Sequence, residues 1–280
     1  MRDLTNQNII HVSKNGIEYI QFRKLLEYKE TINHAYGIGL DRNYRTARSG
    51  EKQLTQEEYQ KAIKDYKDLC TAIGTDYTNC VKPHQEHTKN IKKVEQKINT
   101  DKPDFELKEY SATDGTMTNK ENTILVTTNA DCILLLFFDP VKKAIANVHS
   151  GWKGTLQKIS AQAVIKMQKE YNSNPEDIIC CICPSIRKCH FKVHSDVQEQ
   201  FFNEFRNLKK INKIIEPISG EDRWAIDTVE INKIILKEMG LKEENIIDSK
   251  ICSVCNSDII HSFRVEKEGY GLGTAIIELK

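Results

Sequence analysis

Two histidines and one cysteine are the residues of this sequence best suited to chemistry. His87 stands in a loop-like segment, Cys132 begins an apolar run, and His149 opens the segment 149–154, which reads HSGWKG. Two imidazoles and a thiolate match the donor set of a tetrahedral zinc ion whose fourth position is open, as in catalytic sites. The spacing also permits a plainer interpretation, namely a buried thiol at the start of a strand and histidines that only form hydrogen bonds.

The segment 149–154 carries a second chemical feature. A strand is expected to end at His149, and the chain then passes through Gly151 and Gly154 directly into a helix. Backbone N–H groups at such a turn point toward whatever binds there, and an anion is the natural guest. The alternative is an ordinary strand-to-helix connection whose glycines only satisfy the backbone geometry.

Four further polar residues are candidates for supporting roles. Asp131 precedes the cysteine of the predicted site and could support a ligating histidine or carry a proton, although capping of its turn explains it equally well. Arg42 and Asn43 in the turn-rich segment 36–44, and Arg45 just after it, could line a pocket. Solvated loop residues are the alternative for all three.

Helical patterns surround these segments. Thr55 and Glu58 form a capping box, and apolar residues then recur at helical spacing as far as Gly74. The apolar residues of 154–171 mark another helix. Capping pairs predict two more helices, which begin at Ser195 with Gln198 and at Asp227 with Glu230.

Strand patterns carry the cysteine and the second histidine. The run 132–138 is continuously apolar and ends at an Asp-Pro pair, as expected of a strand buried on both faces. The run 144–149 is its expected partner, because only a short turn separates the two. Since hairpins and strands joined through helices both occur, the sequence predicts an α+β fold in which mixed β-sheets pack against helices.

The composition limits the class of protein. The 280 residues include 41 Lys and Arg against 40 Asp and Glu, and this balance argues against a charge-driven nucleic-acid or membrane partner. No repeat or linker divides the chain, so we expect one domain over residues 1–280. No apolar run suits a signal peptide or a membrane span. Nine cysteines without a secretory signal indicate reduced thiols or metal ligands rather than disulfides, and a cytoplasmic protein.

The other cysteines permit a second metal site. Cys189 and three cysteines within 180–183, together with the Cys252-x-x-Cys255 pair, could hold a structural zinc ion. The spacing is loose, however, and alternate side chains of a strand at 178–182 would face opposite ways. Buried, reduced thiols are therefore the preferred interpretation.

Several segments together resemble the laccase-domain family, also called multicopper polyphenol oxidoreductases and later recognised as purine nucleoside phosphorylases. The block 129–154 carries most of the resemblance through NADC, the following Asp-Pro pair and HSGWKG. Further segments agree in order, and these are Gln85–His87, Pro184 to Cys189, the helix led by Asp227, and the stretch from Cys252 through HSFR to Gly271. The similarity spans about residues 30 to 280.

The resemblance implies a single domain of the family's mixed fold, in which His87, Cys132 and His149 bind zinc and form the catalytic centre. It implies phosphorolysis of adenosine, inosine and methylthioadenosine to a base and ribose 1-phosphate, with adenosine deamination as a second activity. A nucleoside and phosphate are then the partners, and the expected contacts are Arg42, Asn43, Gly151, Lys153 and Arg264. The chain departs from the family's pattern at Thr88, Lys153 and Leu272, where Gly, Arg and Arg are usual.

Two other functions stay open at this point. A copper-dependent polyphenol oxidoreductase is one, because two histidines and a cysteine also suit copper. The histidines outside the predicted site are scattered with no His-x-His pair, which argues against a multicopper cluster and favours zinc over Cu²⁺. The other is a non-catalytic binding module whose fold the zinc ion stabilises.

Overall fold

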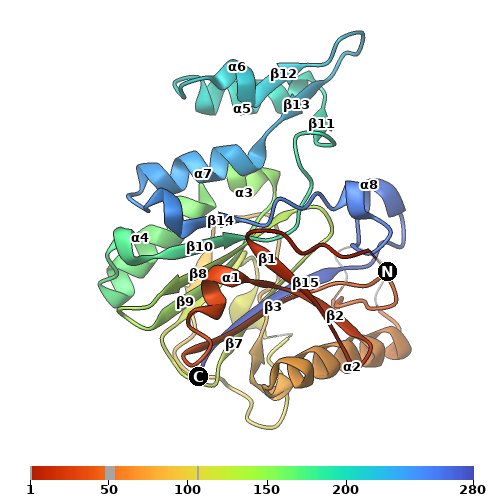
Figure 1. Ribbon diagram of the computed structural model, residues 1–280, viewed down its shortest axis with the longest axis vertical. Helices are drawn as coiled ribbons and strands as arrows, with labels where there is room; N and C mark the ends of the chain where they lie inside the picture. Colours follow the sequence, from red (N-terminus) through yellow and green to blue (C-terminus); the bar gives the residue numbers. More distant parts are fainter. Residues whose placement is uncertain (1, 48–53, 106) are drawn as a thin grey trace.

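Two six-stranded β-sheets packed face to face form the centre of the computed structural model, which describes residues 2–47, 54–105 and 107–280 (Figure 1). The first sheet has the order β1-β2-β3-β15-β7-β4, and only its β4–β7 pair is parallel. Its strands are β1 Ile9–Lys14, β2 Ile17–Phe22, β3 Ile32–Gly37, β15 Gly273–Leu279, β7 Ile124–Asn129 and β4 Cys80–Val81.

The second sheet has the order β14-β10-β8-β9-β6-β5. Its outermost pairs are parallel and its inner pairs antiparallel, so both sheets are mixed, as predicted. Its strands are β14 Ile246–Asp248, β10 Ile179–Ile182, β8 Ile133–Asp139, β9 Ala144–Ser150, β6 Gly115–Thr118 and β5 Ile91–Lys93.

Helices cover the outer face of each sheet and give four layers. Helix α2 packs on the first sheet, whereas α4 and α7 pack on the second. A small third sheet, β11-β13-β12, packs with α5 and α6 and forms the part of the molecule that protrudes at the top of Figure 1. The remaining bounds are α1 Arg23–Leu26, α2 Gln56–Ile73, α3 Trp152–Leu156, α4 Ile159–Tyr171, α5 Ser195–Phe205, α6 Ile211–Ile214, α7 Thr228–Glu238, α8 Phe263–Glu266, β11 Lys192–Val193, β12 Ile215–Pro217 and β13 Trp224–Ile226.

Strand β8 is buried on both faces, which confirms the interpretation of its apolar run. Leu134 and Leu136 face the first sheet, while Leu135 and Phe137 pack under the helices of the opposite layer. The predicted hairpin with β9 is also present and antiparallel. The strand begins at Ile133, one residue later than predicted.

The helix predictions were right in outline and wrong in two details. The capping box of α2 is present, and Gly74 ends this helix at a φ of 80°. The helix predicted over 154–171 is instead two helices, because Lys158 adopts a left-handed conformation between α3 and α4. Ser195 does not cap α5, since it is already the first helical residue and His194 occupies the cap position. In the described part of the chain, no helix combines the length and the apolar character that crossing a bilayer requires.

Asn147 links the two sheets through hydrogen bonds. Its side chain is fully buried on β9, and Nδ2 donates to the carbonyl oxygens of Leu125 at 2.9 Å and Ala275 at 2.8 Å on the first sheet. Its Oδ1 accepts from the hydroxyl of Thr127. The interface between the sheets is therefore held by directional bonds as well as by apolar contact.

We expect Asn147→Ala to lower the free energy of unfolding by about 2 to 4 kcal/mol, because buried acceptors lose their donors and Thr127 loses its acceptor. Chemical denaturation monitored by circular dichroism measures the change. Asn203→Ala, at an exposed position of α5, is the matched control and should shift stability by less than about 0.5 kcal/mol. Equal, small effects in both variants would contradict the assigned role.

Candidate metal centre and its cavity

The β8–β9 hairpin brings Cys132 and His149 to one end of the second sheet. Ile133 pairs with Ser150, so the residue that precedes β8 lies beside the end of β9. His87 reaches the same point from the loop between β4 and β5, where it has a φ of 59°. Residues far apart in the sequence thus meet because two strands and one loop end together.

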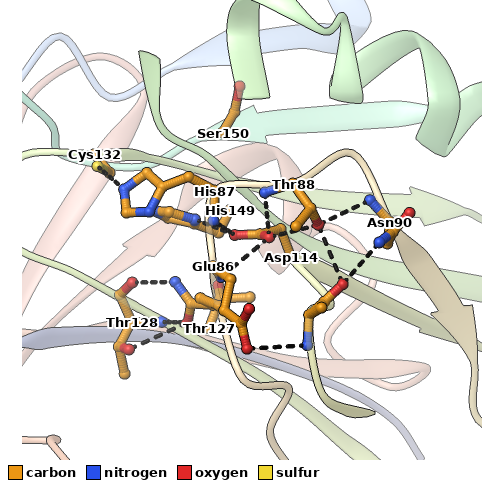
Figure 2. Close-up of polar contacts among 12 residues, drawn as sticks. Glu86, His87, Thr88, Asn90, Asp114, Thr127, Thr128, Cys132, His149 and Ser150 are labelled. Carbon is orange, nitrogen blue, oxygen red and sulfur yellow. Dashed lines mark hydrogen bonds and ion pairs between the residues drawn. The ribbon is translucent and has the colours of Figure 1, made fainter. Parts of the chain in front are cut away.

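The three side chains form one cluster (Figure 2). Cys132 Sγ lies 3.8 Å from His87 Nε2, and the rings of His87 and His149 have centroids 4.9 Å apart at an interplanar angle of 80°. One ligand atom from each residue lies within 4.8 Å of the other two. This spacing suits three ligands of a single metal ion.

Asp114, which precedes β6, holds two of these residues in place. It is fully buried, and its Oδ1 lies 2.8 Å from His149 Nδ1. The carboxylate also accepts hydrogen bonds from the backbone N–H groups of Glu86, His87 and Thr88 at 3.2, 3.0 and 2.6 Å. One carboxylate therefore orients the His149 ring, with Nε2 left for a ligand role, and fixes the loop that carries His87.

Within this cluster, Cys132 and His149 shift each other's pKa values. Burial opposes ionisation of Cys132, but the charge of His149 and hydrogen bonds from His149 and His87 outweigh it and lower the thiol pKa to about 6. Burial likewise opposes the charge on His149, yet the Cys132 thiolate and Asp114 raise the imidazole pKa to about 9. Without a metal ion, the site holds a thiolate beside an imidazolium near neutral pH.

Gly151 permits the close approach of α3 to these ligands. A Cβ atom at this position would lie 2.6 Å from His87 Cδ2 and 3.2 Å from Cys132 Sγ. Only glycine fits this contact without displacement of a ligand. Gly151 was predicted to contact the substrate, and here it packs against the cluster.

The cluster borders a cavity of about 630 Å³. Among the described residues, the cations that line it are Arg45, Lys82 and Arg264. Its aromatic lining comprises Trp152, Phe191, Phe263 and Tyr270. Of the residues predicted to line a pocket or bind substrate, Arg45 and Arg264 lie in this wall. Lys82 was not predicted, because nothing in its spacing sets it apart.

The other predicted contacts lie elsewhere. Arg42 forms ion pairs with Asp65 at 3.0 Å and Asp68 at 2.6 Å on α2, which hold it away from the cavity. Asn43 Oδ1 accepts hydrogen bonds from backbone N–H groups, and Lys153 is exposed with Nζ 5.5 Å from the centre of the Trp152 ring.

Asp131 does not support a ligating histidine. Its carboxylate accepts a 2.6 Å bond from the Ser253 hydroxyl and a 2.7 Å bond from the backbone N–H of Arg264. Asp131 therefore braces the cavity wall, and Asp114 is the carboxylate that binds His149. Thr88, at a position where the predicted family usually has Gly, donates its hydroxyl to Asp114 at 2.8 Å.

A sequence profile of the family described as multi-copper polyphenol oxidoreductase laccase matches residues 44–280. The chain belongs to this family. The resemblance predicted from its motifs is thereby confirmed, and it spans most of the chain.

Relatives of this laccase-domain chain carry enzyme names. It is 29% identical to purine nucleoside phosphorylase YlmD of Bacillus subtilis over 218 residues, an alignment that covers 78% of this chain and 77% of that protein. It is 26% identical to adenosine deaminase RL5 of an unknown prokaryotic organism over 250 residues, an alignment that covers 89% of this chain and 93% of that protein. It is 31% identical over 173 residues to human purine nucleoside phosphorylase LACC1, but this match spans 60% of the chain and 38% of the human protein.

Solved structures confirm the laccase-domain fold. The Bacillus licheniformis protein YfiH superposes with a TM-score of 0.78 at 24% identity, over 95% of this chain and 100% of that one. YlmD from Geobacillus stearothermophilus gives a TM-score of 0.75 at 18% identity over the full length of both chains. The predicted α+β architecture of mixed sheets with packed helices is therefore correct.

In metal-free protein, alkylation of Cys132 by iodoacetamide should follow a thiolate titration with a midpoint near pH 6, because the lowered pKa keeps the thiolate populated down to that pH. The rate should be constant above the midpoint and fall below it. Peptide mass spectrometry measures it at each pH. His149→Ala should move the midpoint toward the ordinary value near 9, whereas His194→Ala, at an exposed site, should not. A wild-type midpoint near 9 would contradict the assigned electrostatics.

Proposed function

We propose that this protein is a zinc-dependent purine nucleoside phosphorylase. It would convert adenosine, inosine or methylthioadenosine and phosphate to the base and ribose 1-phosphate, with adenosine deamination as a second activity. The observation that carries the proposal is the cluster of His87, Cys132 and His149, which supplies three metal ligands at the wall of a cavity large enough for a nucleoside and phosphate. The names of several relatives support the same reaction class.

The donor set fits zinc. Two imidazole nitrogens and one thiolate are preferred zinc ligands, and three protein ligands leave a fourth position for catalysis. His149 Nδ1 is bonded to Asp114, which is the usual support of a metal-bound histidine. When bound, zinc supplies Lewis acidity to a substrate atom or to water.

The chain's own residues would bind and orient the two substrates. Trp152 and Phe263 offer aromatic surfaces on which a purine can stack. Arg45 Nη2 donates to the Tyr270 carbonyl at 2.8 Å, and Arg264 Nη1 donates to the Lys192 carbonyl at 3.3 Å. Since a guanidinium has five N–H donors, each fixed side chain keeps donors for phosphate oxygens. Phosphate held there would meet the positive charge that develops on the sugar as the base leaves.

A copper oxidase has weaker support from the same residues. Within the described residues, metal-ligating side chains gather in two groups, which contain three histidines altogether. A multicopper centre needs a histidine-rich cluster beyond the first ion, and neither group provides one. A non-catalytic module is also less favoured, because a purely structural zinc usually has four protein ligands.

The direct test incubates zinc-loaded protein with adenosine and phosphate and separates the products by chromatography. Adenine with ribose 1-phosphate is the expected result, and inosine would report the deamination. Cys132→Ala should reduce both products to the background level. Folded, zinc-loaded protein that forms neither product would refute the proposal, and phenol-dependent oxygen uptake by copper-loaded protein, well above that of free copper, would favour the oxidase.

Asp114→Asn should weaken zinc binding at this site about 10- to 100-fold, because the neutral amide removes the charge that supports His149 and places a donor against backbone N–H groups. Competition with a chromophoric chelator measures the affinity. Asp196→Asn, an exposed substitution on α5, should bind zinc as the wild type does. Wild-type affinity in Asp114→Asn would show that the carboxylate does not support the metal.

Arg264→Ala should raise the KM for phosphate roughly tenfold or more, because it removes charge-assisted donors from the cavity wall. Lys153→Ala is the matched control, since this exposed side chain lies outside the cavity lining, and its KM should stay unchanged. Initial rates at varied phosphate and saturating adenosine measure both. An equal rise in the two variants would contradict the assigned phosphate contact.

A further inference from the structure

A second group of metal-ligating side chains lies outside the cavity lining. It comprises Cys189, His190, Cys252 and Cys255. The sequence grouped Cys189 with the cysteines of 180–183, but those three thiols are buried in the apolar cores, and His190 takes their place. The buried-thiol interpretation is wrong for Cys189 and Cys255, which are both exposed.

The four ligand atoms converge on one point. Cys189 Sγ lies 3.7 Å from Cys252 Sγ and 3.9 Å from Cys255 Sγ. His190 Nδ1 lies 3.2, 3.6 and 3.5 Å from the sulfurs of Cys189, Cys252 and Cys255. All four atoms are within 4.8 Å of one another.

These separations match the edges of a zinc tetrahedron. Zn–S bonds of about 2.3 Å and Zn–N bonds of about 2.0 to 2.1 Å imply S···S edges of about 3.8 Å and S···N edges of about 3.6 Å. The spacing between Cys252 and Cys255 is the Cys-x-x-Cys spacing common in structural zinc sites. A disulfide, in contrast, would join two of the thiols at about 2.05 Å and leave the third thiol and the imidazole without a role.

Two chain segments are fixed against each other at this point. Cys189 and His190 lie in the turn between β10 and β11, while Cys252 lies just before, and Cys255 within, a short 3-10 helix, Val254–Asn256. Ser185 exchanges backbone hydrogen bonds with Ile251 and Ser253 at 3.3 and 3.0 Å.

Arg187 adds side-chain bonds across the same junction. Its guanidinium binds the Asp248 carboxylate at 2.7 Å, the Ser249 hydroxyl at 2.9 Å and the Ile251 carbonyl at 3.0 Å. The fold thus preorganises the four ligands, which lowers the entropic cost of binding an ion.

We propose that Cys189, His190, Cys252 and Cys255 bind a structural zinc ion with four protein ligands. Its role is to clamp the two segments that support one wall of the cavity. The first segment continues into Phe191 and Val193 of that wall, and the second carries Ser253, whose hydroxyl binds Asp131 beside Cys132. With no position open to substrate, this zinc stabilises the wall and takes no part in the reaction.

The test measures zinc content and zinc K-edge X-ray absorption on the full-length chain in three forms. These are the wild type, a first-site variant with Cys132→Ser and His149→Ala, and a second-site variant with Cys189→Ser and Cys255→Ser. The expected zinc content is two ions per chain in the wild type and one in each variant. The ion kept by the first-site variant should have three sulfur neighbours at about 2.3 Å and one nitrogen neighbour.

Two controls keep the result interpretable. Cys80→Ala alters a thiol that lies 3.9 Å from Cys70, but that pair belongs to no larger ligand group among the described residues, so two zinc ions should remain. Chelation of the zinc in the first-site variant should lower its melting temperature by several degrees, a readout that does not require the second-site variant to fold. A first-site variant that binds no zinc, binds it with another donor set, or contains a disulfide among these cysteines would overturn the proposal.

Discussion

The buried carboxylate of Asp114 is the constraint on which the candidate active site depends. A buried anion is costly unless donors surround it, and here three consecutive backbone N–H groups, a threonine hydroxyl and the His149 ring supply them. The same bonds lower the pKa of Asp114 against the opposing effect of burial, so the carboxylate stays ionised. The hydrogen bonds that stabilise this buried carboxylate therefore also hold His149 and His87, the latter in a left-handed conformation, close together.

The sheets supply the remaining constraint. The β8–β9 hairpin sets Cys132 beside the end of β9, and the burial of β8 between the first sheet and the helices prevents it from shifting. Asn147 anchors β9 to the first sheet two residues before His149. The part of the cavity wall that carries Phe191 and Val193 is instead built from a loop and the short strand β11, so the proposed second zinc would strengthen the least regular part of the site.

The sequence predicted what depends on local pattern. The apolar run of β8, its hairpin partner and the capped helix α2 all follow from periodicity, and His87, Cys132 and His149 stood out by residue type and by the resemblance of their segments. Asp114 could not be found this way, because a lone aspartate before a glycine has no spacing that ties it to a histidine 35 residues later. Arg42, by contrast, was predicted to line the cavity but does not, because its ion pairs with Asp65 and Asp68 on α2 depend on tertiary contacts that the sequence does not reveal. His190 was overlooked because the sequence gives no sign that it lies beside Cys252 and Cys255, which are more than 60 residues further along the chain.

The central claim is that one zinc ion binds between the loop and the hairpin that Asp114 joins. Anomalous diffraction at the zinc edge, from crystals of zinc-loaded protein soaked with phosphate, tests it most directly. The account predicts an ion bonded to His87 Nε2, Cys132 Sγ and His149 Nε2, with its fourth position facing the cavity. An absence of zinc between these three residues, or a fourth protein ligand that closes the site, would contradict it.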